Sequence, residues 1–175
     1  SHEAFNQLAA YLRYKQYKKV VVMADNRTFT AAGRSLCDKL KNESVLYTVC
    51  LIQSDENEDV IADERAIMQV LLETPNDVDA FIAVGAGTVH DITRFSSYKM
   101  KVPFISVPTA PSVDGFTSMG APLIIRGVKK TIQAQAPIAV FADTDVLCQA
   151  PKAMIAAGFG DMVAKYTSLA DWQFA

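Results

Sequence analysis

The fold is decided by Ala80-Phe-Ile-Ala-Val-Gly-Ala-Gly-Thr-Val-His-Asp91. Its first five residues, 80–84, are all apolar, as expected of a short strand that is buried on both faces of a sheet. Glycines follow at once in the turn Gly85–Thr88, and a helical pattern then runs to about Tyr98. A buried strand that turns through glycines into a helix is one unit of a parallel α/β sheet.

The same unit recurs on both sides of this stretch. Strands are predicted at Lys19–Ala24, Val45–Ile52 and Phe104–Val107, and helices at Phe5–Tyr17, Thr30–Lys41 and Asp59–Glu73. Strands that alternate with helices favour a parallel sheet covered on both faces. The sequence therefore predicts an α/β domain with a Rossmann-like parallel sheet flanked by helices.

Beyond the fourth strand the pattern changes. Residues 108–122 are loop-like, Leu123–Arg126 and Thr131–Gln135 predict a hairpin that turns at Gly127, and Ile138–Ala142 predicts another strand. From Pro151 the pattern is helical, and the apolar stretch Met162–Phe174 has no cap residue after it. We therefore expect a fragment. It comprises an α/β domain over residues 1–150 and, over 151–175, the first helices of an incomplete all-helical domain.

Composition narrows the class of protein. The 175 residues are 50% hydrophobic with a mean hydropathy of +0.13, which excludes global disorder. Lysine and arginine total 17 against 19 acidic residues, without a run of like charge, so we expect no nucleic acid and no membrane as partner. The three cysteines, Cys37, Cys50 and Cys148, are predicted to be buried free thiols, and a cytoplasmic location is expected.

The glycine turn is the first candidate for chemistry. Glycines at a strand-to-helix turn let main-chain amides approach a pyrophosphate, whose charge the helix N-terminus favours. The motif is incomplete as a GxGxxG fingerprint because His90 stands at its sixth position. An ordinary turn with Thr88 as helix cap is the alternative.

The second candidate is the loop Pro108–Ser118, which follows the next strand. Ligands of open α/β sheets bind beyond the carboxyl ends of the strands, so this loop and the glycine turn should face one crevice. Thr109, Ser112, Asp114 and Ser118 offer hydroxyls and a carboxylate there. Local capping of turns by the serines and the aspartate is the alternative.

Two further carboxylates stand out. Asp25 follows the first strand, where it could bind the ribose hydroxyls of a dinucleotide or form a local Asx turn. Asp161 follows Gly158 and Gly160, which indicate a break, and it is predicted at the start of a helix, as an N-cap, an ion-pair partner of Lys165 or a metal ligand. A metal site needs about three protein ligands, and this chain does not supply a complete set.

Three long motifs carry a resemblance to a known family. They are Val84–Arg94, Pro103–Ser118 and Ala157–Trp172. Together they resemble glycerol-1-phosphate dehydrogenases, above all the bacterial enzymes of the arabinose-operon type. Those enzymes belong to the superfamily of iron-containing alcohol dehydrogenases and dehydroquinate synthases. The likeness runs over nearly the whole chain.

The resemblance implies a site and a reaction. Contacts to NAD or NADP would come from Asp25, Gly87, Thr88, Val89, His90, Asp91, Thr109, Ala110, Pro111, Ser112 and Ser118. Asp114 would contact the substrate, and Asp161 would bind both the substrate and a divalent metal, zinc or nickel. The reaction implied is metal-assisted hydride transfer between the nicotinamide cofactor and dihydroxyacetone phosphate, which gives sn-glycerol 1-phosphate. Lys165 is a possible partner of the phosphate.

Other functions stay open from the sequence. A glycerol dehydrogenase or a dehydroquinate synthase-like enzyme could use the same scaffold, and this chain alone could be a non-catalytic nucleotide-binding module. The resemblance implies a small phosphorylated substrate, a homodimer and a role in phospholipid metabolism.

Overall fold

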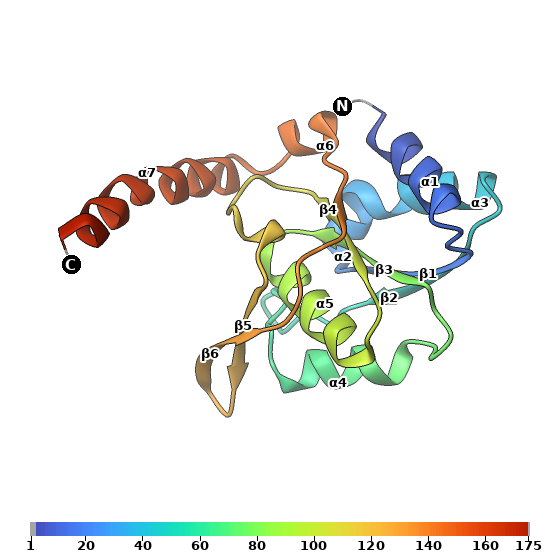
Figure 1. Cartoon of the computed structure of the whole chain (residues 1–175), viewed down its shortest axis with the longest axis horizontal. Helices are drawn as coiled ribbons and strands as arrows, with labels where there is room; N and C mark the ends of the chain where they lie inside the picture. The colour runs from blue at the N-terminus through green and yellow to red at the C-terminus, as the bar shows by residue number, and fades with distance from the viewer. Residues whose placement is uncertain (1–2, 175) are drawn as a thin grey trace.

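The computed structural model describes residues 3–174. Its centre is a five-stranded sheet in the order β2-β1-β3-β4-β7, and every neighbouring pair of strands is parallel (Figure 1). The strands are β1 (Lys19–Ala24), β2 (Leu46–Leu51), β3 (Ala80–Gly85), β4 (Phe104–Pro108) and β7 (Ala139–Val140). The predicted Rossmann-like parallel sheet is confirmed.

Helices cover both faces of this sheet. Helices α1 (Ala4–Tyr14) and α3 (Arg34–Asn42) pack on one face, and α4 (Glu64–Glu73) and α5 (Gly87–Met100) on the other. Short elements complete this part of the chain: α2 (Asn26–Thr28), a π-helical turn (Phe29–Gly33), a 3-10 turn (Gly115–Thr117) and α6 (Thr144–Cys148).

The alternation of side chains along the buried strands divides the core into two layers. In β1, Val20 and Val22 face α1 and α3, whereas Val21 and Met23 face α4 and α5. All six residues of β3 are buried, which is why this strand has no polar face in the sequence.

A two-stranded antiparallel hairpin, β5 (Gly120–Ile125) with β6 (Val128–Gln133), lies beside α5. The predicted turn at Gly127 is confirmed, with a φ of 75° that glycine adopts without strain. Ala121 and Leu123 of β5 are buried against the layer under α5. The hairpin thus closes the α4 and α5 face of the sheet.

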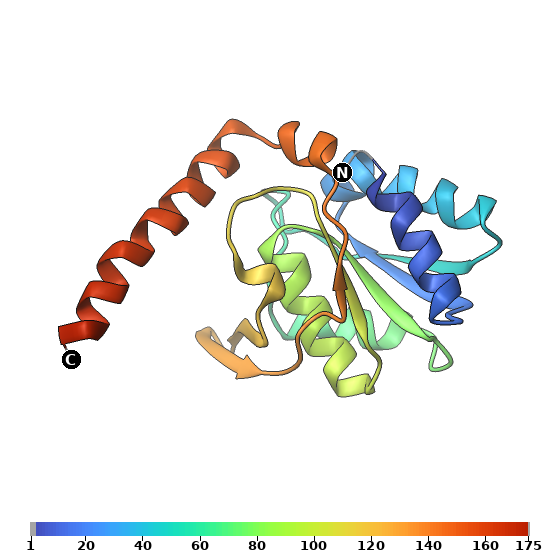
Figure 2. The same cartoon turned by 45° about the horizontal axis from the view of Figure 1, so that its top comes forward.

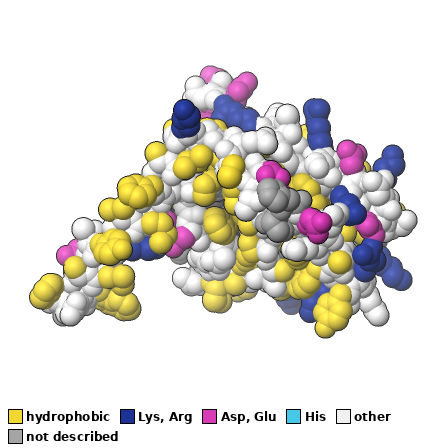
Figure 3. Space-filling view, turned by 90° about the horizontal axis from the view of Figure 1, so that it is seen from above, with side chains coloured by type: hydrophobic (Ala, Val, Ile, Leu, Met, Phe, Trp, Pro, Cys, Tyr) yellow, Lys and Arg dark blue, Asp and Glu magenta, His cyan; other side chains and the backbone are white. Residues whose placement is uncertain are grey.

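The last helix, α7 (Lys152–Phe174), extends away from the sheet (Figure 2). None of its described residues is buried, and Figure 3 shows hydrophobic side chains gathered along this arm. The large apolar side chains exposed there are Ile155, Phe159, Met162, Val163, Tyr166, Leu169, Trp172 and Phe174. The range predicted for a second domain, 151–175, ends one residue beyond the described part of the chain. Within that part, no helix is long and apolar enough to span a membrane.

The structure corrects three local predictions. Helix α4 begins at Glu64 instead of at residue 59, because the Asp63 side chain accepts a hydrogen bond from the Ala66 N–H and caps the helix there. Cys148 is exposed, whereas Cys37 and Cys50 are buried as predicted.

The third correction concerns Asp161, which lies inside α7 and not at the start of a helix. Gly158 and Gly160 were the signal for a break between two helices, but both are helical. A glycine costs a helix only about 1 kcal/mol relative to alanine, and the flanking alanines and methionines favour the helix.

Candidate active site

Three segments meet at the carboxyl edge of the sheet, as predicted. Asp25 follows β1, the glycine turn follows β3, and Thr109 follows β4, where its main-chain N–H donates to the Gly85 carbonyl at 2.9 Å. The strand order reverses between β1 and β3, since the chain first adds β2 on one side and then β3 on the other. Open α/β sheets bind ligands at such a switch point.

Two cavities flank the start of α5. The first, of about 640 Å³, is bounded by the ends of β1, β3 and β4, by the loop before α4 and by the start of α7. Its lining includes Asp25, Arg27, Glu58, Asp59, Thr88, Val89, Thr109, Ala110, Gln149 and Met154. The second, of about 570 Å³, includes Gly87, Thr88, Asp91, Asp114, Ser118 and Lys129. Because Thr88 and Val60 line both, the two cavities adjoin at the helix N-terminus.

The N-terminus of α5 is suited to an anion. The cap residue is Ala86, so the alternative with Thr88 as the cap is wrong, and no side chain caps the helix. The first main-chain N–H groups of the helix therefore have no capping acceptor, and they carry the positive end of the helix dipole. A Cβ at Gly87 would lie 3.3 Å from Val113 Cγ2, so a larger residue there would require Val113 to shift.

Asp25 forms the local cap that its sequence left open as an alternative. Its Oδ1 accepts from the Thr28 N–H at 2.7 Å, and its own N–H donates to Thr28 Oγ1 at 3.0 Å. The carboxylate is half-buried and lines the first cavity. Capping uses one of its two oxygens, so a ligand hydroxyl can still bind to the other.

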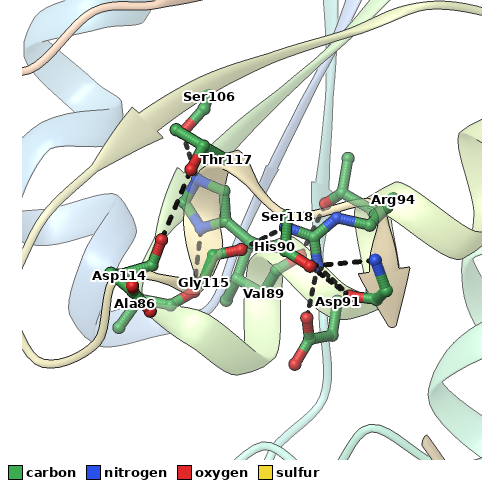
Figure 4. Close-up of polar contacts among 12 residues, drawn as sticks. Ala86, Val89, His90, Asp91, Arg94, Ser106, Asp114, Gly115, Thr117 and Ser118 are labelled. Atoms are coloured by element: carbon green, nitrogen blue, oxygen red, sulfur yellow. Dashed lines mark hydrogen bonds and ion pairs between the residues drawn. The ribbon is translucent and has the colours of Figure 1, made fainter. Parts of the chain in front are cut away.

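Arg94 anchors the loop of the second cavity to α5 (Figure 4). Its side chain is fully buried, and its guanidinium donates to Asp91 Oδ1 at 2.5 Å, the Gly120 carbonyl at 3.0 Å and the Gly115 carbonyl at 2.6 Å. The guanidinium carbon also lies 5.8 Å from the centre of the Phe104 ring. A single side chain thus fixes both ends of residues 115–120 against the helix.

His90 faces the core, away from both cavities. Its Nε2 lies 2.7 Å from Ser106 Oγ and its Nδ1 lies 2.9 Å from the Ala86 carbonyl (Figure 4). Burial lowers the pKa of His90 to about 4, so the imidazole is neutral at physiological pH. The predicted cofactor contact of His90 stays a prediction, and its side chain does not reach the lining of either cavity.

Asp114, Asp161 and Lys165 join the loop to α7. Lys165 Nζ lies 3.0 Å from Asp114 Oδ2 and 3.2 Å from Asp161 Oδ2, and the Asp114 N–H donates to Asp161 Oδ2 at 3.1 Å. The Asp114 N–H and then Lys165 lower the pKa of Asp161, and Asp114 raises the pKa of Lys165. The predicted ion pair between Asp161 and Lys165 is confirmed, and two carboxylates share one cation.

Gly158 permits this approach of α7. A Cβ at position 158 would lie 1.7 Å from the carbonyl oxygen of Pro111, a distance that no real contact allows. The glycine that suggested a helix break therefore lets α7 touch the loop after β4.

The residues that the sequence singled out are mostly brought together. Asp25, Gly87, Thr88, Val89, Asp91, Thr109, Ala110, Asp114 and Ser118 line the two cavities. Pro111 and Ser112 are not among the lining residues, and Ser118 Oγ accepts from the Gly120 N–H at 2.9 Å in a local turn. Sequence reasoning gave no role to Arg27, Arg94, Lys129 or Gln149. Arg94 ends the motif Val84–Arg94, but neither that motif nor any period indicates what its side chain contacts.

The described residues hold no group of three or more histidine, cysteine, aspartate or glutamate side chains that could bind a metal. The donors next to the cavity nevertheless suit a cation, because the carboxylates of Asp114 and Asp161 already share the ammonium group of Lys165. Asp161 could therefore supply one carboxylate ligand to a divalent metal.

A doubly wound parallel sheet with cavities at its switch point defines the class of α/β domains that bind nucleotides beyond the carboxyl ends of their strands. The family follows from the sequence. Residues 1–151 match the model of the iron-containing alcohol dehydrogenases, and the chain belongs to that family.

Individual relatives extend this result. The chain is 99% identical over 175 residues to a glycerol-1-phosphate dehydrogenase [NAD(P)+] of Geobacillus thermodenitrificans, and it spans 43% of that relative's length. In structure it is similar to glycerol dehydrogenase from Schizosaccharomyces pombe, with a TM-score of 0.82, 24% identity and coverage of 95% of this chain and 41% of that one. It is also similar to a 2-deoxy-scyllo-inosose synthase complexed with carbaglucose-6-phosphate, NAD+ and Co2+. There the TM-score is 0.76 at 16% identity, with coverage of 90% and 45%.

Proposed function

We propose that the chain is the nucleotide-binding part of an oxidoreductase that interconverts dihydroxyacetone phosphate and sn-glycerol 1-phosphate with NAD or NADP. One observation carries the proposal: the carboxylates of Asp114 and Asp161 meet around one cation beside the cavities at the switch point. The name of the Geobacillus relative supports this choice of substrate. Residues 1–150 form the nucleotide-binding domain in this proposal, and 151–175 begin a helical metal and substrate domain.

The uncapped N-terminus of α5 is proposed to bind the cofactor's pyrophosphate. Asp25 then takes the ribose hydroxyls in the first cavity, and Ser118 lies at the other end, in the second cavity. The remaining proposed contacts are Gly87–Asp91 and Thr109–Ser112. When bound, the nicotinamide supplies the hydride.

Asp114 and Asp161 are proposed to handle the substrate's reacting end. Asp161 stays ionised because hydrogen bonds lower its pKa, so it can serve as an anionic metal ligand. A divalent metal held there, zinc or nickel, would supply Lewis-acid polarisation of the ketone. Asp114 orients a substrate hydroxyl, and Lys165 pairs with the substrate's phosphate group.

The proposal includes a cellular setting. We place the protein in the cytoplasm as a homodimer that acts on a small phosphorylated substrate in phospholipid metabolism, without a nucleic acid or membrane partner. The net charge of −2, without like-charge runs, supports the absence of a polyanionic partner.

The proposal is tested in the full-length Geobacillus relative by the substitution Asp161→Asn, where the residue number is that of the chain described above. We expect loss of bound metal and a fall in turnover of dihydroxyacetone phosphate of at least about a hundredfold, since a metal ligand is removed. Asp171→Asn, which changes an exposed carboxylate on the same helix, is the control and should keep both. Full activity with the metal retained in Asp161→Asn would refute the assignment.

Substrate choice needs its own assay. Glycerol, glycerol 1-phosphate and the phosphorylated precursor of dehydroquinate are offered to the same enzyme with NAD. We expect turnover of glycerol 1-phosphate alone. Preference for either of the other two compounds would replace the proposed reaction by that of the corresponding relative.

A further inference from the structure

We infer that Arg27 is the residue that binds the 2′-phosphate of NADP. We infer also that the carboxylates of Glu58 and Asp59 compete with this phosphate for Arg27 and so favour NAD. The inference deepens the proposed function and rests on it, because it assumes that the cofactor's adenosine half lies in the first cavity.

The position of Arg27 follows from the topology. In dinucleotide-binding α/β folds, an acidic residue near the glycine turn binds the adenosine ribose, and a nearby arginine accommodates the 2′-phosphate of NADP. Here Asp25 directly follows β1, which pairs with β3, the strand that leads into the glycine turn. Arg27 follows two residues later and lines the same cavity. The cavity thus contains both an acidic residue placed for the ribose, Asp25, and an arginine placed for the 2′-phosphate, Arg27.

Arg27 is held by weak, exchangeable contacts. Its Nη1 lies 3.3 Å from Asp59 Oδ1 and its Nη2 lies 3.1 Å from Glu58 Oε2. All three side chains are more than half exposed, at 59% for Arg27, 80% for Glu58 and 69% for Asp59. Exposed ion pairs of this kind stabilise little, so a doubly charged phosphate, which guanidinium binds bidentately, can displace the carboxylates.

Hydrogen bonds within one turn hold the main chain that carries the two opposing carboxylates. Asp55 Oδ1 accepts from the main-chain N–H groups of Asn57 and Asp59, each at 2.9 Å, and the Asp55 N–H donates to the Asp59 carbonyl at 2.8 Å. Glu58 and Asp59 therefore line the cavity from a hydrogen-bonded turn.

The charges around the cavity predict the direction of the preference. A 2′-phosphate entering here meets one guanidinium and three carboxylates, those of Asp25, Glu58 and Asp59. The repulsion favours NAD, and Arg27 preserves the use of NADP. This accounts for a site that accepts both cofactors, as the name of the Geobacillus relative says of that enzyme.

The experiment uses two probes that differ only in the 2′-phosphate, 2′,5′-ADP and 5′-AMP. Their dissociation constants are measured by calorimetry on the full-length Geobacillus relative and its Arg27→Ala variant. Loss of one charge-assisted contact should weaken 2′,5′-ADP by about tenfold. Binding of 5′-AMP should stay within about twofold, since it does not use that contact. Arg34→Ala, which removes an exposed arginine outside the cavity, should leave both constants unchanged.

The converse variant sharpens the test. Glu58→Gln combined with Asp59→Asn removes the competing charges, so 2′,5′-ADP should bind several times more tightly while 5′-AMP does not change. Equal weakening of both probes in Arg27→Ala, or none, would overturn the inference and leave the cofactor site standing. Failure of 5′-AMP to bind the unaltered enzyme would instead overturn the cofactor site, and the inference with it.

Discussion

Helices α5 and α7 both carry candidate site residues, yet they hold them in opposite ways. In α5, seven of fourteen residues are buried, and the polar ones among them include His90, Thr93 and Arg94. In α7 no described residue is buried, and Asp161 and Lys165 are each about one-third exposed. The same loop, residues 109–120, contacts both helices.

The two helices hold the loop 109–120 in place by two different kinds of contact. Arg94 holds the loop from inside through two hydrogen bonds, to the Gly115 and Gly120 carbonyls, while Asp91 of the same helix pairs with its guanidinium. Lys165 holds it from outside through an ion pair that solvent and salt weaken. We therefore expect the inner attachment to be part of the folded state itself. The outer one can open without unfolding, as the proposed exchange of its cation for metal and substrate requires.

The largest effect is expected from Arg94→Met in the 175-residue chain. The substitution removes the guanidinium that pairs with Asp91. It also removes the hydrogen-bond donor of the Gly115 and Gly120 carbonyls. Removing one member of a buried ion pair costs about 3–5 kcal/mol, so the free energy of unfolding should fall by that amount. Urea unfolding followed by circular dichroism measures it.

A double-mutant cycle with Asp91→Asn supplies the control. In the double variant no unpaired carboxylate is left, so part of the lost free energy should return. A loss below about 1 kcal/mol in Arg94→Met would show that the inner attachment is no stronger than an exposed pair. The contrast between the two helices would then fail.

Arg94 also shows which part of the site could not be predicted from the sequence. The apolar run 20–24, which follows Lys19, and the apolar run 80–84 predicted β1 and β3 almost to the residue, because a strand buried on both faces is apolar throughout. Parallel strands place their carboxyl ends together, so the meeting of Asp25, the glycine turn and Thr109 could be foreseen. Arg94 and Arg27 could not, since the direction of a long side chain depends on tertiary contacts that periodicity does not encode.

The same limit explains the wrong local predictions. The apolar period before Glu64 continues through residues that pair with β5, as the bridge between Asp63 and Ile124 shows, so periodicity placed the start of α4 too early. The helix break expected near Asp161 rested on Gly158, whose role is the contact with Pro111. A glycine that serves packing is indistinguishable in sequence from one that ends a helix.

A smaller effect, on pH dependence, is expected from the buried histidine of α5. Burial holds the pKa of His90 near 4, and Arg94 adds to the effect, whereas an unfolded histidine titrates near 6.5. The unfolded chain therefore takes up a proton first as the pH falls, so stability decreases from pH 6.5 to pH 4. In His90→Gln this contribution is absent. Relative to this variant, the unaltered chain should lose roughly 2–3 kcal/mol over that range.

The measurement is the free energy of unfolding at several pH values for both chains, taken as a difference so that the other titrating groups cancel. Ser106→Ala is the matched control, because it removes the hydrogen-bond partner at 2.7 Å but keeps the imidazole. It should retain the loss at low pH. Parallel curves for the unaltered chain and His90→Gln would mean that His90 is not held neutral by the core.

The smallest effect is expected from Lys165→Met, and it should be local. Without the shared cation, the carboxylates of Asp114 and Asp161 repel each other, and the hydrogen bond from the Asp114 N–H to Asp161 opens more often. Hydrogen exchange of the Asp114 amide should accelerate by a factor of about two to five, the range that exposed ion pairs support. Added salt should have a similar effect on the unaltered chain, while the amide of buried Ile92 in α5 should not respond to either change.

Lys152→Met, at the exposed start of α7, controls for the loss of a positive charge on this helix. If the Asp114 amide exchanges at the same rate in Lys165→Met, packing at Gly158 and not the ion pair holds α7 to the loop. The outer attachment would then depend on packing and not on charge.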